Sequence, residues 1–159
     1  MKTNAARLLD SLGIEYQVLS YAVDLDDLVA ISTAQKLGLP TDQVFKTLVV
    51  NGYSQGIAFA VVPGSYRLNL KALAQLSGDR KLETVPLKQV QPLTGYVRGG
   101  VTALASKKPY PVFLDEWAEV YEQIAVSAGM RGQMLWLRTA DYVKATNAVV
   151  GAIAQETLS

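Results

Sequence analysis

Hydrophobic residues recur along the chain at strand and helix spacings, and two nearly continuous apolar runs stand out. Residues 47–51 and 57–62 are such runs, and they flank the polar, glycine-containing segment 51–56. Apolar runs of this length with a short polar connection are typical of two antiparallel strands joined as a hairpin. Because both runs are apolar at almost every position, we expect them to lie centrally in a sheet that is covered on both faces.

Helical spacing of apolar residues indicates further elements, and most of these begin at a capping residue or end at a glycine. The expected helices run from Thr3 or Asn4 to Gly13, over 28–37 before Gly38, from Asn69 to Gly78, from Pro86 to Val90, over 115–120, and from a cap at Thr139. The residues expected to face inward on the first two are Ala5, Leu8, Leu9 and Leu12, then Ile31, Ala34 and Leu37.

Short strands are expected at 14–21, 81–85, 111–114, 124–127 and 134–137. The sequence contains no internal repeat, low-complexity tract or linker. We therefore expect residues 1–159 to form one α+β domain, with an antiparallel or mixed sheet and helices around it.

Composition narrows the class of protein. Half of the 159 residues are hydrophobic and 18% are charged, which is ordinary for a globular protein. Fifteen Lys and Arg against fourteen Asp and Glu leave a net charge of +1, which argues against a broad basic face for long nucleic acid but allows a local basic pocket. No apolar run is long enough for a signal peptide or a membrane span, so we expect a cytoplasmic protein.

Two residue types are missing altogether, because the chain has no Cys and no His. This excludes disulfides, thiolate nucleophiles, Ser-His-Asp triads and imidazole or thiolate metal sites. We expect neither a metal nor another cofactor. An enzyme with this composition would use carboxylates, lysine, hydroxyls, backbone groups or groups of the substrate itself.

Three polar features interrupt the apolar pattern: the pair Lys46-Thr47, the glycine loop (residues 94–102, which contains Gly99-Gly100), and the serine loop (residues 127–132). Lys46 has two interpretations, because its ammonium group can extend from a strand end into water or can meet an anionic or carbonyl-bearing ligand in a cleft. Glycines either permit a turn with positive φ or let backbone N–H groups approach a ligand. A pocket with one cation, backbone donors and hydroxyls suits an already reactive ester, whose tetrahedral oxyanion needs donors.

With these features in this order, the sequence resembles the YbaK/EbsC family of aminoacyl-tRNA deacylases. That family shares its fold with the editing domain of bacterial prolyl-tRNA synthetases. The similar segments are 36–39 with 42–48 (KLGL and DQVFKTL), 94–101 (TGYVRGGV) and 126–132 (VSAGMRG). The resemblance covers nearly the whole chain. It implies a barrel-like mixed sheet surrounded by helices, and hydrolysis of a mischarged aminoacyl-tRNA, most often cysteine on proline tRNA.

The resemblance also implies roles for individual residues. Lys46 would hold the phosphate or carbonyl side of the 3′-terminal adenosine, and the substrate's own thiol or hydroxyl, or a water, would attack. The carbonyl would be polarised by backbone groups. The implied catalytic residues are Lys46, Gly99, Gly100 and Val101, and the implied substrate-binding residues are Tyr21, Thr47, Ser127 and Gly129. The implied partner is the 3′ end of an aminoacyl-tRNA, and prolyl-tRNA synthetase is a candidate source of tRNA selectivity because the chain is near neutral.

Two alternatives stay open at this point. A non-catalytic module could keep the fold and bind a nucleotide or a partner, and this alternative is favoured by three departures from the family's pattern, Ala103, Ala128 and Met134. A simple esterase would act equally on small esters that lack the tRNA body.

Overall fold

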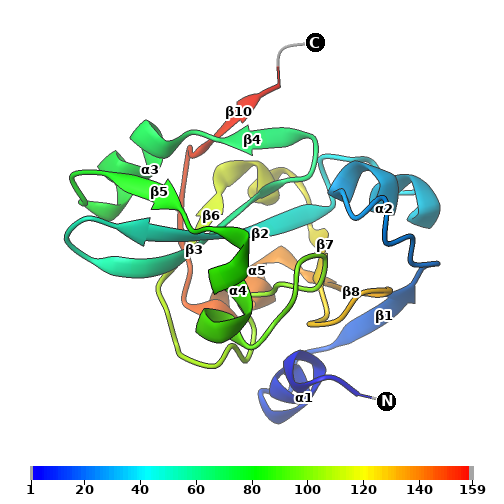
Figure 1. Cartoon of the computed structure of the whole chain (residues 1–159). Helices are drawn as coiled ribbons and strands as arrows, with labels where there is room; N and C mark the ends of the chain where they lie inside the picture. Colours follow the sequence, from blue (N-terminus) through cyan, green and yellow to red (C-terminus); the bar gives the residue numbers. More distant parts are fainter. Residues whose placement is uncertain (1, 158–159) are drawn as a thin grey trace.

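The structure is a computed structural model that describes residues 2–157, and strands make up its centre (Figure 1). The elements in chain order are α1 (Asn4–Ser11), β1 (Tyr16–Ser20), α2 (Ala30–Leu37), β2 (Phe45–Gly52), β3 (Gly56–Pro63), β4 (Tyr66–Leu68), α3 (Leu70–Ser77), β5 (Leu82–Thr84), α4 (Leu87–Thr94), β6 (Val112–Asp115), a 3₁₀ helix η1 (Glu116–Val120), β7 (Gln123–Ser127), β8 (Gln133–Arg138), α5 (Thr139–Thr146), β9 (Val149–Gly151) and β10 (Ala154–Glu156).

The strands form three sheets. A five-stranded sheet has the order β5-β2-β3-β6-β9, in which β5, β2 and β3 are antiparallel neighbours and β6 and β9 pair in parallel. A second sheet has the order β1-β8-β7, and β10 pairs with β4. One isolated parallel bridge, Val44 to Ala125, joins the start of β2 to β7. The α+β class with mixed sheets is confirmed, and the sheets curve around the core without closing into a barrel.

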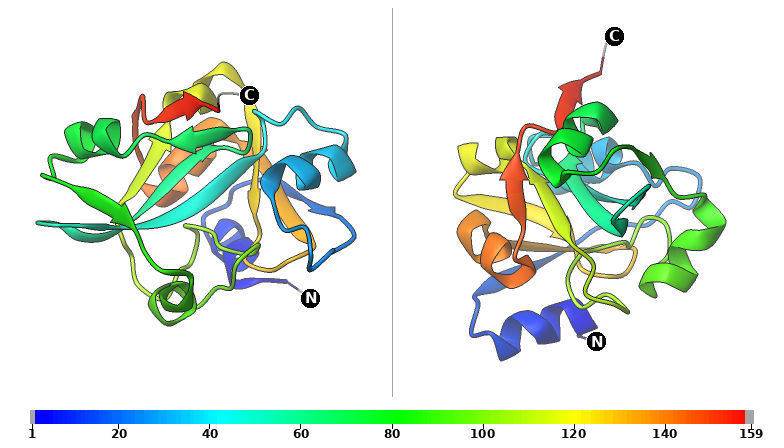
Figure 2. Two further views of the ribbon diagram at one scale, coloured as in Figure 1. Left: turned by 45° about the horizontal axis from the view of Figure 1, so that its top comes forward. Right: turned by 90° about the vertical axis from the view of Figure 1, so that its left-hand side faces the viewer.

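The expected hairpin is confirmed, with β2 and β3 in register from Phe45 opposite Pro63 to Gly52 opposite Gly56. Side chains on β3 alternate between two cores. Phe59 and Val61 face the larger core, while Ala60 and Val62 face a second core beneath α3. In both views of Figure 2, α3 and α4 accordingly lie on opposite sides of the five-stranded sheet.

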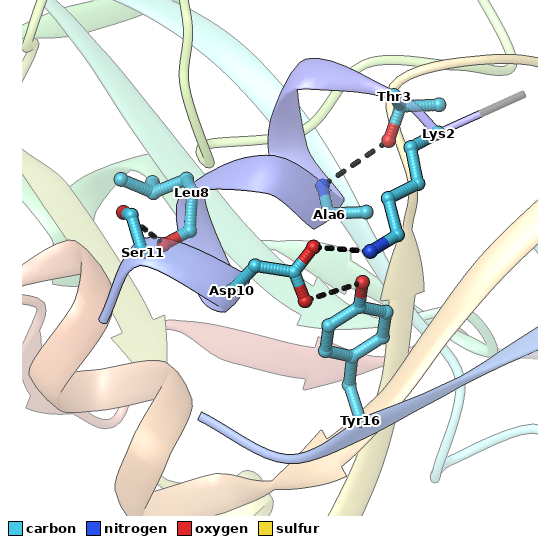
Figure 3. A network of polar contacts seen from close by, with 7 residues as sticks. All are labelled: Lys2, Thr3, Ala6, Leu8, Asp10, Ser11 and Tyr16. Carbon is cyan, nitrogen blue, oxygen red and sulfur yellow. Dashed lines mark hydrogen bonds and ion pairs between the residues drawn. The ribbon is translucent and has the colours of Figure 1, made fainter. Parts of the chain in front are cut away.

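Most helix ends lie where the capping residues predicted them. The Thr3 hydroxyl accepts from the backbone N–H of Ala6 at 3.2 Å. Asn69 caps α3 in the same way, and Gly38 and Gly78 end their helices with positive φ. Figure 3 shows how the first helix is fixed to β1: the Asp10 carboxylate accepts from the Lys2 ammonium at 2.6 Å and from the Tyr16 hydroxyl at 3.0 Å.

Several sequence-based expectations were wrong. Leu12 and Ile31, expected to face inward, are 51% and 41% exposed. Thr139 does not cap α5; its hydroxyl instead donates to the carbonyls of Ala118 and Tyr121. The helix after Pro86 continues beyond Val90 to Thr94, and the three-residue strands β4, β9 and β10 were missed. No helix among residues 2–157 is long and apolar enough to cross a membrane.

Candidate functional site

A cavity of about 590 Å³ lies along the first half of β2. Six of the eight residues implied by the sequence resemblance line it, namely Tyr21, Lys46, Thr47, Gly99, Val101 and Ser127. Gly100 and Gly129 do not line it. Residues far apart in the chain thus meet at one place, and the volume lies in the usual range for ligand sites.

The cavity exists because the outer edge of β2 is only partly paired. β7 meets this edge in the single bridge at Val44, and β5 joins it from Val50 onward. The N–H of Val85 donates to the carbonyl of Val49 at 3.0 Å, which marks where pairing resumes. Between these points β2 has no neighbouring strand on that side within the described chain, and the cavity occupies the gap.

Lys46 is half-buried at this gap. Its ammonium donates to the carbonyl of Gly64 at 3.3 Å. No carboxylate lies within ion-pair distance of it among residues 2–157. Burial lowers the pKa of Lys46, because desolvation disfavours the charged form. A partly desolvated cation without a counter-ion is suited to meet an anionic or polarised group of a ligand.

The whole cavity is electropositive in composition. Arg67 on β4 and Arg98 in the glycine loop line it together with Lys46, and no Asp or Glu of the described chain does so. Arg67 was missed by the sequence analysis. It stands in a three-residue strand and carries no motif, so only the fold brings it to the site.

Tyr21 lines the cavity and contacts two other segments of the chain. Its N–H donates to the carbonyl of Gly132 at 3.0 Å, and the ammonium of Lys36 lies 5.9 Å from its ring centroid. The end of β1 is therefore attached to the end of the serine loop.

The glycine loop contains a tight turn. The N–H of Gly100 donates to the carbonyl of Val97 at 2.9 Å, and Gly99 occupies the third position of this turn with φ +87°. A glycine is favoured at that position of a type II turn. The Gly100 N–H is therefore already bonded, whereas the N–H groups of Gly99 and Val101 have no acceptor within the described residues. Both residues line the cavity, so their N–H groups are candidate donors to a ligand, as is the N–H of the neighbouring Arg98, which likewise has no acceptor in the described chain.

The glycine and serine loops pack directly on each other. A Cβ at Gly100 would lie 3.0–3.2 Å from the main chain of Met130 and Arg131, and a Cβ at Gly129 would lie 2.9 Å from the Tyr96 ring. The Arg131 guanidinium donates to the carbonyl of Arg98 at 2.7 Å. Gly100 and Gly129 thus allow the close approach that holds the two loops together, and they do so from outside the cavity.

Thr47 and Ser127, the threonine and the serine implied by the resemblance, both line the cavity, but neither hydroxyl is freely available there. The Ser127 hydroxyl accepts from the N–H of Gly129 at 3.2 Å. The Thr47 hydroxyl is buried and has no hydrogen-bond partner in residues 2–157, and the same holds for the hydroxyl of Tyr142 on α5. Burial raises the pKa of Tyr142, and the nearby Thr47 hydroxyl opposes this rise, although the pair does not reach hydrogen-bonding geometry.

Metal chemistry has no evident ligand set here. Within the described part of the chain, no three Asp or Glu side chains are grouped so that they could hold a metal ion. The site offers cations and main-chain N–H groups, which can bind an anion and stabilise a developing oxyanion. Hydroxyl side chains, among them those of Ser65, Tyr66 and Thr84, also line it.

Comparison with known proteins places the chain in a family. Residues 29–145 match the model of the aminoacyl-tRNA editing domain. The chain is 40% identical over 146 residues to the "Putative Cys-tRNA(Pro)/Cys-tRNA(Cys) deacylase EbsC" of Enterococcus faecalis, covering 92% of this chain and 89% of that protein.

Solved structures agree in fold. A structure described as a "putative trans-editing enzyme for prolyl tRNA synthetase" superposes with a TM-score of 0.83 at 25% identity, covering 98% of this chain and 99% of the other. A hypothetical protein superposes with a TM-score of 0.87 at 24% identity, covering 96% and 100%, and this match speaks for the fold alone. The extent of the family match and the identity to the Enterococcus protein show that the chain belongs to the aminoacyl-tRNA editing domain family.

Proposed function

We propose that this protein hydrolyses the ester between a wrongly attached amino acid and the 3′ end of a tRNA. The observation that carries the proposal is the cavity at the gap in β2, which is lined by Lys46, Arg67 and Arg98 and by no carboxylate of the described chain. Such a site attracts the phosphates of a nucleic-acid end. The whole chain, residues 1–159, would act as one editing domain.

We assign parts in this reaction to Lys46 and to the glycine loop. Lys46 holds and orients the 3′-terminal nucleotide or the ester carbonyl. The free N–H groups of Gly99 and Val101 stabilise the oxyanion of the tetrahedral intermediate, and Gly100 supports them by closing the turn. No described residue at the cavity is an imidazole or thiol base, so the nucleophile comes from the substrate's own side chain or from water.

The names of the relatives suggest the substrate. We infer Cys-tRNA(Pro) as the first substrate to test, because the Enterococcus relative is described as acting on it. Prolyl-tRNA synthetase is the proposed partner for tRNA selection, since a net charge of +1 leaves the chain itself few contacts for the tRNA body.

The test is a deacylation assay with cysteinyl-, alanyl- and seryl-tRNA, in which released amino acid is followed with time. We expect one of these esters to be cleaved well above its spontaneous rate, and the same aminoacyl ester on a short alcohol to be cleaved far more slowly. Equal rates on the short ester would indicate a simple esterase. Binding of an uncleavable aminoacyl-adenosine without hydrolysis of any tRNA ester would indicate a non-catalytic module and would refute the proposal.

A further inference from the structure

The strands β2 and β7 separate just where the cavity begins. They meet only in the bridge between Val44 and Ala125, where the N–H of Ala125 donates to the carbonyl of Gln43 at 3.1 Å. Beyond this bridge the pairing stops, and both Thr47 and Ser127 line the cavity.

The direction of the Thr47 main chain follows from the ladder. In an antiparallel pair, successive residues direct their N–H and C=O alternately toward one neighbouring strand and away from it. The carbonyl of Val49 accepts from Val85 on the outer side of β2, and the N–H of Gly64 reaches the carbonyl of Val44 on the β3 side at 2.7 Å. Thr47 is two residues from Val49, so its N–H and C=O point outward into the gap.

The same reasoning applies to Ser127 on the other wall. The N–H of Ala128 donates to the carbonyl of Gln133 on the β8 side at 3.2 Å, whereas Ala125 donates toward β2. Ser127 alternates with Ala128, so its main-chain groups point away from β8 and toward β2. The Thr47 hydroxyl is buried, so the main chain is the polar part of Thr47 that can face the cavity. The Ser127 hydroxyl accepts from Gly129 within the serine loop, and the main chain of Ser127 is available beside it.

We propose that this slot between Thr47 and Ser127 binds the α-aminoacyl group itself through main-chain hydrogen bonds, so that the protein selects α-aminoacyl esters over other acyl esters. An α-aminoacyl group carries an N–H donor and a C=O acceptor on either side of one Cα, which is the arrangement of a residue in a strand. It can therefore pair with Thr47 or Ser127 as a single added residue. This inference rests on the proposed deacylase function.

The charge of the cavity supports a main-chain acceptor. No carboxylate of the described chain lines the cavity, so none is there to hold the α-amino group. Main-chain carbonyls such as that of Thr47 can accept from the amino group instead, beside the hydroxyls of Ser65, Tyr66 and Thr84 that also line the cavity.

The kinetic test compares each aminoacyl-tRNA that the protein cleaves with an ester that differs only in lacking the α-amino group. For cysteine this is 3-mercaptopropionyl-tRNA, which keeps the thiol, and for alanine it is propionyl-tRNA. Each enzymatic rate is divided by the spontaneous hydrolysis rate of the same ester, because the α-amino group also activates the ester chemically. Loss of a hydrogen bond from a polar or charged group should lower this ratio roughly tenfold or more.

A second measurement reports on the main chain directly. The amide ¹⁵N–¹H signals of Thr47 and Ser127 are followed while an uncleavable 3′-aminoacylamino adenosine is added, and the des-amino analogue serves as the matched control. We expect at least one of the two signals to shift on saturation with the aminoacyl analogue and to shift less with the control. Unmoved signals at saturation would overturn the inference.

The two proposals fail in different ways. If the protein cleaves amino and des-amino esters with equal normalised rates, the slot does not read the amino group, while the deacylase function stands. If it cleaves no aminoacyl-tRNA, the proposed function fails first.

Discussion

Replacing Lys46 by methionine separates the charge of this residue from its packing. Methionine keeps an unbranched apolar stem but removes the ammonium group. In the folded protein this group is half-buried, its pKa is lowered by burial, and it donates to the Gly64 carbonyl at 3.3 Å. Removing a partly desolvated charge should leave the fold at least as stable as before.

The expected loss of activity can be estimated from the charge. A unit charge about 4 Å from an anionic group at an effective dielectric constant of about 20 gives roughly 4 kcal/mol. Desolvation of the ligand offsets part of this, and hydrogen bonds to charged groups contribute about 1.5–3 kcal/mol in practice. We therefore expect Lys46→Met to lower kcat/KM by about tenfold to a hundredfold.

The assay measures initial rates of deacylation for the wild type, Lys46→Met and the control Lys71→Met. Lys71 is exposed on α3 and outside the cavity, so its replacement removes one positive charge without touching the site. Thermal unfolding is followed on the same samples. Wild-type rates for Lys46→Met would refute the anchoring role, and a loss of rate that accompanies a fall in Tm would assign the effect to folding.

Four further results follow from the same geometry. Binding of an uncleavable analogue should weaken as the pH rises through the lowered pKa of Lys46, because the ammonium then loses its proton. Lys46→Arg should move this loss of binding to higher pH, and wild-type binding that does not change with pH would contradict the prediction. Arg67→Gln should weaken tRNA binding, and it should reduce by about 1 the slope of the logarithm of the association constant against the logarithm of the salt concentration. Arg80 is exposed and outside the cavity, so Arg80→Gln should bind tRNA as the wild type does. Gly100→Ala should lower the free energy of unfolding by about 1–3 kcal/mol and should also lower kcat/KM, because the new Cβ would meet the main chain of the serine loop. A denaturant titration measures the first effect, and unchanged values of both quantities would show that the loops can separate freely. Tyr142→Phe should raise the free energy of unfolding by about 1 kcal/mol, since it removes a buried hydroxyl without a partner, and a lower Tm would point to an unseen hydrogen bond.

Local signals in the sequence predicted much of the fold. Thr3, Asn69, Gly38 and Gly78 mark helix ends through contacts within a few residues, which is why they could be recognised without a structure. The strands β4, β9 and β10 have three residues each, too few to show a period, and their pairing depends on distant partners.

The site was predictable only in part, for the same reason. Lys46 and the glycine pair interrupt a pattern and so attract notice, and the cavity is lined by Lys46 and Gly99. Arg67 and Tyr142 look ordinary in the sequence, because their positions at the cavity and behind Thr47 depend on how separate elements pack. The direction of a main-chain group is likewise set by strand pairing, so the unpaired part of the β2 edge cannot be predicted from the residue types.

The contact between the glycine and serine loops has a consequence for building variants. The loops are about thirty residues apart in the chain, yet the Gly100 position touches the Met130 main chain and Gly129 lies against the Tyr96 ring. Segments exchanged with a relative of different substrate preference should therefore be exchanged as a pair. A chimaera that receives one foreign loop would bring two surfaces together that were not shaped for each other, whereas one that receives both would carry a single preassembled unit.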